Sequence, residues 1–322
     1  MDTVPCTFIE SVFVRCGYSL TDQVEKLTGR WRKLVETYVK KCGSLELSYA
    51  PYDEKEWRLH YQLHGWPHIK TRTLTKEVVK EMSRNITVIF VNLMDSLEHP
   101  DGSFDPNNRD DDAVLQLLTG LGAPKRRIFL NGDEDSYGTE ALKYAEMVSR
   151  YKCFLRPFQA VQMYFFDNLW VHCLVNDMVS HGKVVHIIIM NPVSEISSRF
   201  WDDFFLSKTS RSFCGDFEHF DDILAIIRQW RNADPLHLVP HKLFKGIGSQ
   251  TEKTRVEDFV DVGMTPVPVE SVGAELFERI RREITRKDPS ISLYRIDHLV
   301  DPSRKAYIVF EERYSYCFIL FE

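Results

Sequence analysis

Three histidines stand four residues apart, at a spacing that could place metal ligands on one face of a helix. They are His60, His64 and His68. Pro67 lies among them, and proline interrupts a helix. Apolar and polar residues alternate through this region instead, which is typical of a half-buried strand. We therefore expect His60 and His64 on one face of a strand and no metal site. The opposite face would carry Trp57, Leu59, Tyr61 and Leu63.

Two loops have partial ligand-binding motifs. Residues 105–116 begin like an EF-hand calcium loop, but its sixth and twelfth positions hold Asp110 and Gln116, where Gly and Glu are needed. Gly246-x-Gly248 lacks the third glycine of a dinucleotide loop and the Gly-Lys-Ser/Thr of a P-loop. The sequence therefore predicts no metal and no cofactor.

Catalytic motifs are also missing from the chain. Asp202-Asp203 and Asp221-Asp222 are adjacent carboxylates, but both pairs fall in the first turns of predicted helices, where the helix dipole explains them. No Gly-x-Ser-x-Gly, His-Glu-x-x-His or kinase motif set occurs. We expect no enzymatic activity, although an enzyme whose site is assembled from distant residues stays an alternative.

A helix near the C-terminus carries a run of basic residues that could bind phosphate or nucleic acid. Acidic residues alternate with them, which favours an ion-paired surface exposed to solvent. The basic residues are Arg279, Arg281, Arg282, Arg286 and Lys287. The net charge of −6 further argues against a dedicated nucleic-acid binder.

The elements that must position such residues follow a recurring pattern from residue 86 onward. An apolar strand ends in a small polar residue, and an amphipathic helix follows. The predicted strands are 86–92, 127–131, 161–167, 186–191 and 212–214. The predicted helices are 113–121, 139–151, 169–180, 200–207 and 221–233. The polar residues Asp167, Asn191 and Cys214 are 24 and 23 residues apart, as in leucine-rich repeats.

The fold class is therefore α/β, and two arrangements remain open. One is a repeat-like curved sheet, and the other is a conventional α/β sheet whose strands end in turn-forming residues. Strands at 45–49 and 57–63 form a hairpin, and residues 73–84 form a helix. Residues 245–273 are predicted to be a connector before a last helix, 274–285. An antiparallel meander then closes the chain, with strands at 292–298, 306–311 and 316–321.

Composition places the chain among ordinary globular proteins. It has 322 residues, of which 43% are hydrophobic and 27% charged. The seven cysteines include no C-x-x-C pair, so we expect reduced, mostly buried thiols. Neither a secretory signal nor a long apolar run is present. We expect a cytoplasmic or nuclear protein with no membrane contact.

The first forty residues read as three short amphipathic helices, at 5–15, 20–27 and 29–41. Pro5 suits the first turn of the first helix, and Thr28 suits the cap of the third. Apolar residues of the third helix form one stripe. They are Trp31, Leu34, Val35, Tyr38 and Val39.

This segment resembles an F-box, the three-helix module that docks a substrate receptor onto the Skp-type linker of a cullin ubiquitin ligase. Val4-Pro5 stands where the family has Leu-Pro. Residues 27–31, Leu-Thr-Gly-Arg-Trp, stand where it has a Val-Ser-x-Arg-Trp-like string. The chain is also similar to nematode F-box-type proteins, whose remaining sequence is an F-box-associated, leucine-rich-repeat-like domain. Residues 222–233 and the closing strands carry that second similarity.

The resemblance implies a substrate-recognition adaptor of a cullin-type ubiquitin ligase. Residues 1–43 would be the F-box-like module, and residues 44–322 would be a binding domain for an unknown target protein. The surface that binds the Skp-type linker, with its supporting core, would comprise Val4, Pro5, Ile9, Val12, Leu20, Leu27 and Trp31. The alternative is a repeat-like protein-binding scaffold unrelated to ubiquitin ligases.

Overall fold

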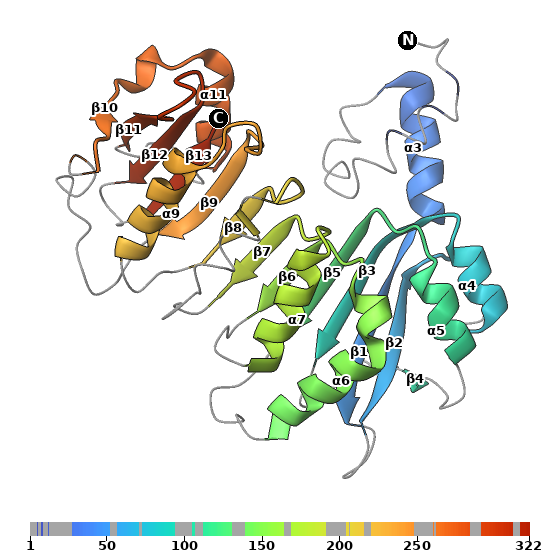
Figure 1. The fold of residues 1–322 in the computed structure, drawn as a ribbon. Coiled ribbons are helices and arrows are strands. Elements are labelled where there is room, and N and C mark those ends of the chain that lie inside the picture. Colours follow the sequence, from blue (N-terminus) through green and yellow to red (C-terminus); the bar gives the residue numbers. More distant parts are fainter. Residues whose placement is uncertain are drawn as a thin grey trace. The chain divides into compact units, whose positions relative to one another are not determined.

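The chain divides into two compact units in a computed structural model, and each is described by itself (Figure 1). We call Met1–Val161 the N-terminal unit and Gln162–Glu322 the C-terminal unit. The residues that the structure describes are Pro5, Phe8, Val12, 28–51, 57–70, 73–93, 105–106, 112–130, 139–163, 169–190, 204–205, 207–215, 220–247, 260, 262–283, 291–311 and 316–322.

The N-terminal unit contains a mixed sheet with the strand order β4-β2-β1-β3-β5. Its strands are β1 (Gly43–Pro51), β2 (Trp57–Gly65), β3 (Ile86–Leu93), β4 (Asp105–Pro106) and β5 (Lys125–Leu130). Its helices are α3 (Gly29–Lys41), α4 (Lys76–Met82), α5 (Asp112–Thr119) and α6 (Thr139–Leu155). Strand β1 pairs antiparallel with β2 and parallel with β3, and β3 pairs parallel with β5. A short strand, β6 (Ala160–Met163), spans the boundary between the units.

One face of this sheet is apolar and carries the helices. The rings of Tyr49 and Tyr151 of α6 meet edge to face with 5.9 Å between their centroids. The backbone N–H of Leu74, just before α4, donates to the hydroxyl of Tyr61 at 2.9 Å. The alternation expected at residues 57–63 is confirmed, because Leu59, Tyr61 and Leu63 are buried on this face.

A single residue separates helix α3 from strand β1. The N–H of Cys42 donates to the carbonyls of Tyr38 and Val39, and the Cys42 carbonyl accepts the N–H of Trp66 at 3.2 Å. A Cβ atom on Gly43 would lie 2.3 Å from the Trp66 ring, which is too close for any other side chain. This close packing fixes the end of α3 to the turn that follows β2.

The C-terminal unit contains the strand order β7-β8-β9-β13-β12-β11-β10. Its strands are β7 (His186–Ile189), β8 (Ser212–Cys214), β9 (Lys242–Ile247), β10 (Thr265–Pro266), β11 (Ile291–Asp297), β12 (Lys305–Glu311) and β13 (Tyr316–Phe321). Its helices are α7 (Leu169–Ser180), α9 (Phe220–Asn232), the 3-10 turn η3 (Val269–Ser271) and α11 (Ala274–Glu283). Strands β7, β8 and β9 are parallel, and the pairs from β9 onward are antiparallel.

Both faces of the sheet in the C-terminal unit are packed. On one face, aromatic rings meet edge to face, with 4.8 Å between the centroids of Phe205 and Phe321. Trp230 of α9 lies against Phe321 at 5.4 Å, so α9 covers this face. On the other face, Ile280 of α11 is buried in a second core. The strand residues of that core are Leu293, Tyr307, Val309, Phe318 and Leu320.

Most predicted elements are confirmed, including the mixed α/β class, the hairpin and the C-terminal meander. Helix α3 has the predicted bounds, whereas the first two predicted helices lie outside the described residues apart from Pro5, Phe8 and Val12. The connector predicted at 245–273 is wrong at its start, where β9 continues to Ile247. This strand has a Lys-rich, Gly-containing sequence, and it forms because β8 and β13 pair with it on both sides.

Candidate functional site

The predicted linker-binding surface is only partly within the described residues. Pro5 is exposed, and the N–H of Phe8 donates to its carbonyl at 3.1 Å. Phe8 and Val12 have helical backbone, one turn apart, and Val12 and Trp31 are half-buried. Val4, Ile9, Leu20 and Leu27 lie outside the described residues.

Phe8 is the residue that the predicted surface omitted. Its side chain is 54% exposed, the largest apolar exposure that the structure describes in this segment. The signal was in the sequence, because Phe8 stands four residues before Val12 and therefore shares its helix face. Pro5 and Phe8 are therefore two exposed apolar residues within one turn of the chain.

The middle of the predicted apolar stripe of α3 packs against the rest of the protein. Val35 is buried, and Trp31, Leu34 and Tyr38 are half-buried, whereas Val39 is 37% exposed. No hydrogen bond from the Thr28 side chain caps this helix. Trp31 therefore supports the helical segment through packing and leaves part of its surface accessible.

A second candidate surface lies on the N-terminal unit, on the sheet face opposite the helix contacts of Tyr49 and Tyr61. We call it the open face and define it by nine half-exposed or exposed residues. They are Ser44 and Glu46 of β1, Gln62 and His64 of β2, Phe90 and Asn92 of β3, and Lys125, Arg127 and Phe129 of β5. The register brings these four strands side by side and points these side chains to one side.

A carboxylate organises the centre of the open face. Glu46 accepts a hydrogen bond from the side-chain amide of Asn92 at 2.7 Å. Its other oxygen lies 2.9 Å from the Nε2 atom of His64. These contacts join three adjacent strands and satisfy both carboxylate oxygens, so Glu46 positions its neighbours rather than awaiting a cation.

Aromatic and basic side chains occupy the β5 side of the open face. Phe90 stands directly beside Arg127 in the parallel register, and Asn92 stands beside Phe129. Both phenylalanines are half-exposed, and Arg127 is exposed. Aromatic residues and arginine are the types enriched in protein-binding surfaces. The arrangement can therefore bind a partner through apolar contact and positive charge together.

The open face ends in a buried region where β4 pairs with β2. His60 is 3% exposed and pairs in register with Pro106 of β4. Ser48, opposite His60 on β1, has no exposed surface. The prediction that His60 and His64 share a strand face is confirmed, and their different exposure separates a core histidine from a surface one.

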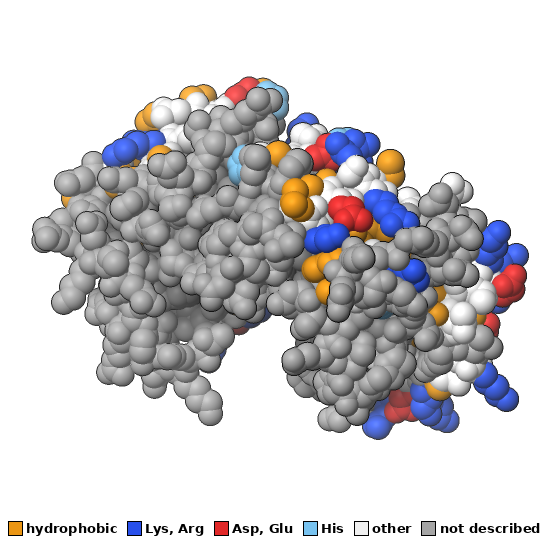
Figure 2. Space-filling model, turned by 90° about the horizontal axis from the view of Figure 1, so that it is seen from below, with side chains coloured by type: hydrophobic (Ala, Val, Ile, Leu, Met, Phe, Trp, Pro, Cys, Tyr) orange, Lys and Arg blue, Asp and Glu red, His pale blue; other side chains and the backbone are white. Residues whose placement is uncertain are grey.

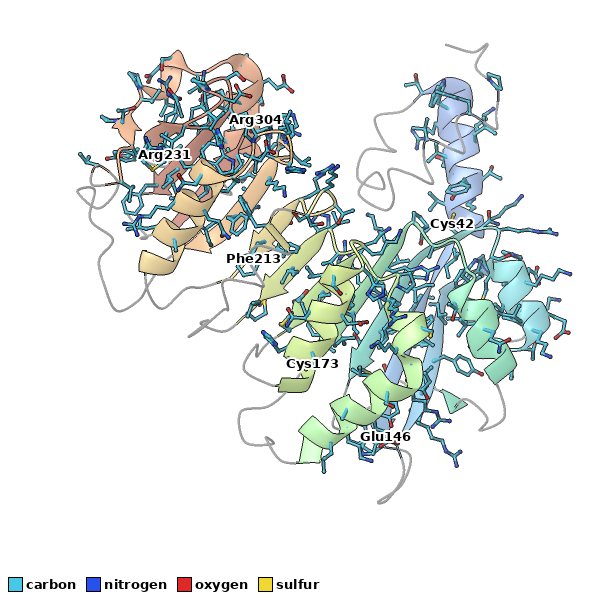
Figure 3. The ribbon with its side chains drawn as sticks, in the orientation of Figure 1. Cys42, Glu146, Cys173, Phe213, Arg231 and Arg304 are labelled. Carbon is cyan, nitrogen blue, oxygen red and sulfur yellow. The ribbon has the colours of Figure 1, made fainter. Side chains whose placement is uncertain are left out.

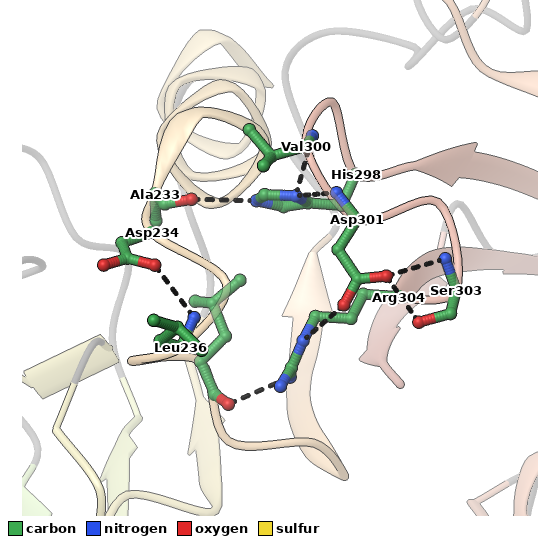
Figure 4. Close-up of polar contacts among 9 residues, drawn as sticks. Ala233, Asp234, Leu236, His298, Val300, Asp301, Ser303 and Arg304 are labelled. Atoms are coloured by element: carbon green, nitrogen blue, oxygen red, sulfur yellow. Dashed lines mark hydrogen bonds and ion pairs between the residues drawn. The ribbon is translucent and has the colours of Figure 1, made fainter.

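The buried histidine His298 of the C-terminal unit could be taken for a functional residue, but backbone groups occupy both of its ring nitrogens (Figure 4). The Nε2 atom of His298 donates to the carbonyl of Ala233 at 2.9 Å. Its Nδ1 atom accepts the N–H groups of Val300 and Asp301, each at 3.2 Å. Both ring nitrogens are therefore occupied, and His298 ties the turn before β12 to the end of α9.

A buried lysine in the same unit is also structural. The Lys242 ammonium donates to the carbonyls of Phe205 and Ser207 and to the hydroxyl of Ser210. It also lies over the Phe205 ring, 5.1 Å from its centroid. Burial, with a smaller contribution from Arg211, lowers the pKa of Lys242 to about 8. Because three acceptors hold the amine, it pins residues 205–210 to β9 and does not act as a nucleophile.

The expected ion pairing of the basic helix α11 holds for Arg279 alone among its described basic residues, because Arg281 and Arg282 take part in no ion pair there. Arg279 pairs with the Glu322 carboxylate, and Lys245 of β9 pairs with Glu283. These contacts run from the helix to the sheet rather than along the helix. Figure 2, a view of the molecule from below, shows basic and acidic side chains interspersed with hydrophobic ones on the described part of that surface.

The cysteines require one correction. Cys42 is buried, but Cys153 of α6 and Cys173 of α7 are exposed, so the expectation of mostly buried thiols is wrong for the four described free cysteines. Figure 3 labels Cys42 and Cys173. Both exposed thiols lie on the outer sides of amphipathic helices. The composition of the chain could not predict this exposure, because the orientation of each helix decides which cysteine faces solvent.

The part of the chain that the structure describes contains neither a candidate metal site nor a candidate membrane-spanning helix. No group of three His, Cys, Asp or Glu side chains there could hold a metal ion. None of the helices described is long and apolar enough to cross a membrane. Comparison with known proteins yields no matching family, no similar curated protein and no similar solved structure.

Proposed function

We propose that this protein is a substrate-recognition adaptor of a cullin-type ubiquitin ligase. Its N-terminal helical segment would bind a Skp-type linker, and its α/β part would bind a target protein. The observation that carries the proposal is the exposure of Pro5 and Phe8 in one helical turn. These residues lie in the segment that resembles an F-box.

The junction after α3 supports this division of labour. An adaptor must hold its target at a defined place relative to the ligase. Cys42 is the one residue between α3 and β1, and Trp66 packs against Gly43 so closely that no flexible linker separates helix and strand. A partner that contacts α3 itself would thus be held close to the sheet of the N-terminal unit.

The strand order supports a repeat-like binding domain. In the N-terminal unit β1, β3 and β5 are parallel neighbours in the sheet, although β2 and β4 lie between them in the chain. In the C-terminal unit β7, β8 and β9 are parallel neighbours that also follow one another in the chain. A doubly wound sheet would reverse its order at a switch point. Parallel sheet neighbours that follow the direction of the chain are the arrangement of repeat proteins.

A pull-down with the full chain and a Skp-type linker tests the proposal. We expect the wild type to be retained and Phe8→Asp to lose about tenfold or more in affinity, because a charge would enter the apolar contact. Leu142→Asp is the matched control, since Leu142 is 66% exposed on α6 and lies far along the chain from the docking segment. Absence of micromolar binding by the wild type would refute the ligase assignment.

A protein-binding scaffold outside the ubiquitin system is the second candidate. The half-buried Trp31 and buried Val35 favour it, because they give α3 a role as a cap on the α/β domain. In that case the linker would not bind, and Phe8→Asp would leave all partner binding unchanged.

A further inference from the structure

We propose that the open face of the N-terminal unit binds an acidic protein segment that carries an aromatic or other large apolar side chain. This inference rests on the proposed function, since it names the kind of target that the adaptor would present. The open face is the surface defined above by Glu46, Phe90, Arg127 and their neighbours.

Charge on the open face favours an acidic partner. Lys125 and Arg127 lie on the same side of β5, and within the described residues neither takes part in an ion pair. Glu46 is the one acidic residue among the nine that define the face, and His64 and Asn92 already occupy its oxygens. The chain as a whole carries −6, so this positive site is local and complements a negatively charged segment.

The two phenylalanines favour an apolar anchor in that segment. Phe90 and Phe129 lie on neighbouring strands of the sheet, and both are half-buried, so part of each side chain stays accessible. Each could bury further aromatic surface under a partner side chain, at about 25 cal/mol for each Å² removed from water. Because the strands fix both rings in advance, binding requires little ordering of this surface.

Aromatic and basic residues could also bind the bases of single-stranded nucleic acid by stacking, but the Glu46 carboxylate argues against this partner. A continuous phosphate backbone would pass the Glu46 carboxylate at the centre of the face. A polyanion gains affinity mainly from many basic contacts, and this face offers two unpaired ones. An acidic peptide can place its charges beside β5 and its apolar residue over the rings.

Selection from a displayed library of random peptides on the immobilised full chain tests the inference. We expect enriched peptides to combine Asp or Glu with Phe, Leu or Trp. A synthetic copy of the strongest peptide should bind Arg127→Glu about tenfold more weakly than the wild type. Arg84→Glu is the matched control, because Arg84 is an exposed arginine in the turn after α4.

Several results would overturn the inference. They are enrichment without acidic residues, equal binding by Arg127→Glu and Arg84→Glu, tighter binding of poly(U) RNA than of the peptide, and no enrichment at all. Failure here is separable from failure of the proposed function. Phe8→Asp should lose the Skp-type linker and keep the peptide, whereas Arg127→Glu should keep the linker and lose the peptide.

Discussion

The two units treat the second face of their sheets in opposite ways. In the N-terminal unit the face away from the helix contacts of Tyr49 keeps Phe90, Arg127 and Phe129 half-exposed or exposed. In the C-terminal unit α11 covers the second face, and Leu293 and Val309 beneath it are no more than 2% exposed. One added amphipathic helix thus turns a potential binding surface into a core.

The largest expected effect compares an apolar truncation on the two faces. Leu293→Ala should lower the free energy of unfolding by about 2–5 kcal/mol, because it leaves a cavity under α11. Phe90→Ala should cost about 1 kcal/mol or less, because its ring is half-exposed. Urea unfolding followed by circular dichroism measures both. Similar losses for the two variants would show that the open face is packed like a core.

The second expected effect concerns the buried amine of Lys242 in the C-terminal unit. Below pH 8 the Lys242 amine is charged in both states, and the folded protein bears the cost of burying it. Between pH 8 and the unfolded value of 10.5 the folded state binds fewer protons, so stability rises with pH. Relative to Lys242→Met, the wild type should gain about 3 kcal/mol across this window, as a shift of this size implies.

Unfolding free energies of both proteins at several pH values measure this gain. Lys125→Met is the control variant, because the Lys125 side chain is half-exposed on the open face. A constant difference between the wild type and Lys242→Met from pH 8 to pH 10.5 would contradict the enclosure of Lys242.

The smallest expected effect concerns a feature that the two units share, an exposed cysteine on a helix. Cys153 of the N-terminal unit and Cys173 of the C-terminal unit are exposed on their helices. Both should react with iodoacetamide in the native protein, whereas Cys42 should be protected. Burial encloses the Cys42 thiol and raises its pKa. Mass spectrometry of the digested protein measures the extent of labelling at each cysteine. Rapid native labelling of Cys42 would show that the junction after α3 opens.

Much of the fold could be predicted from local pattern. Alternation at 57–63 and helical periodicity at 169–180 yielded β2 and α7, because each pattern reflects one buried face. Strand β9 could not be predicted in this way. Its Lys245 and Gly246 read as the start of a connector, and the strand exists because β8 and β13 supply hydrogen bonds on both sides.

The candidate sites divide in a similar way. The resemblance to an F-box implied Pro5 and Trp31, and Phe8 could have been found from its helical spacing to Val12. The open face could not have been found. Residues 125–127 are three consecutive basic residues, and only their register against β3 shows that Arg126 turns inward while its neighbours face out.

The sequence by itself determined the α/β class and most helices and strands, including the third of the three helices expected in the first forty residues. Periodicity and turn residues act over a few positions, so a single chain displays them directly. Only the tertiary structure decided that Lys242 and His298 are enclosed and that α11 covers one sheet while another keeps an open face. Those outcomes depend on contacts between residues far apart in the chain, such as Lys242 with Phe205 and His298 with Ala233.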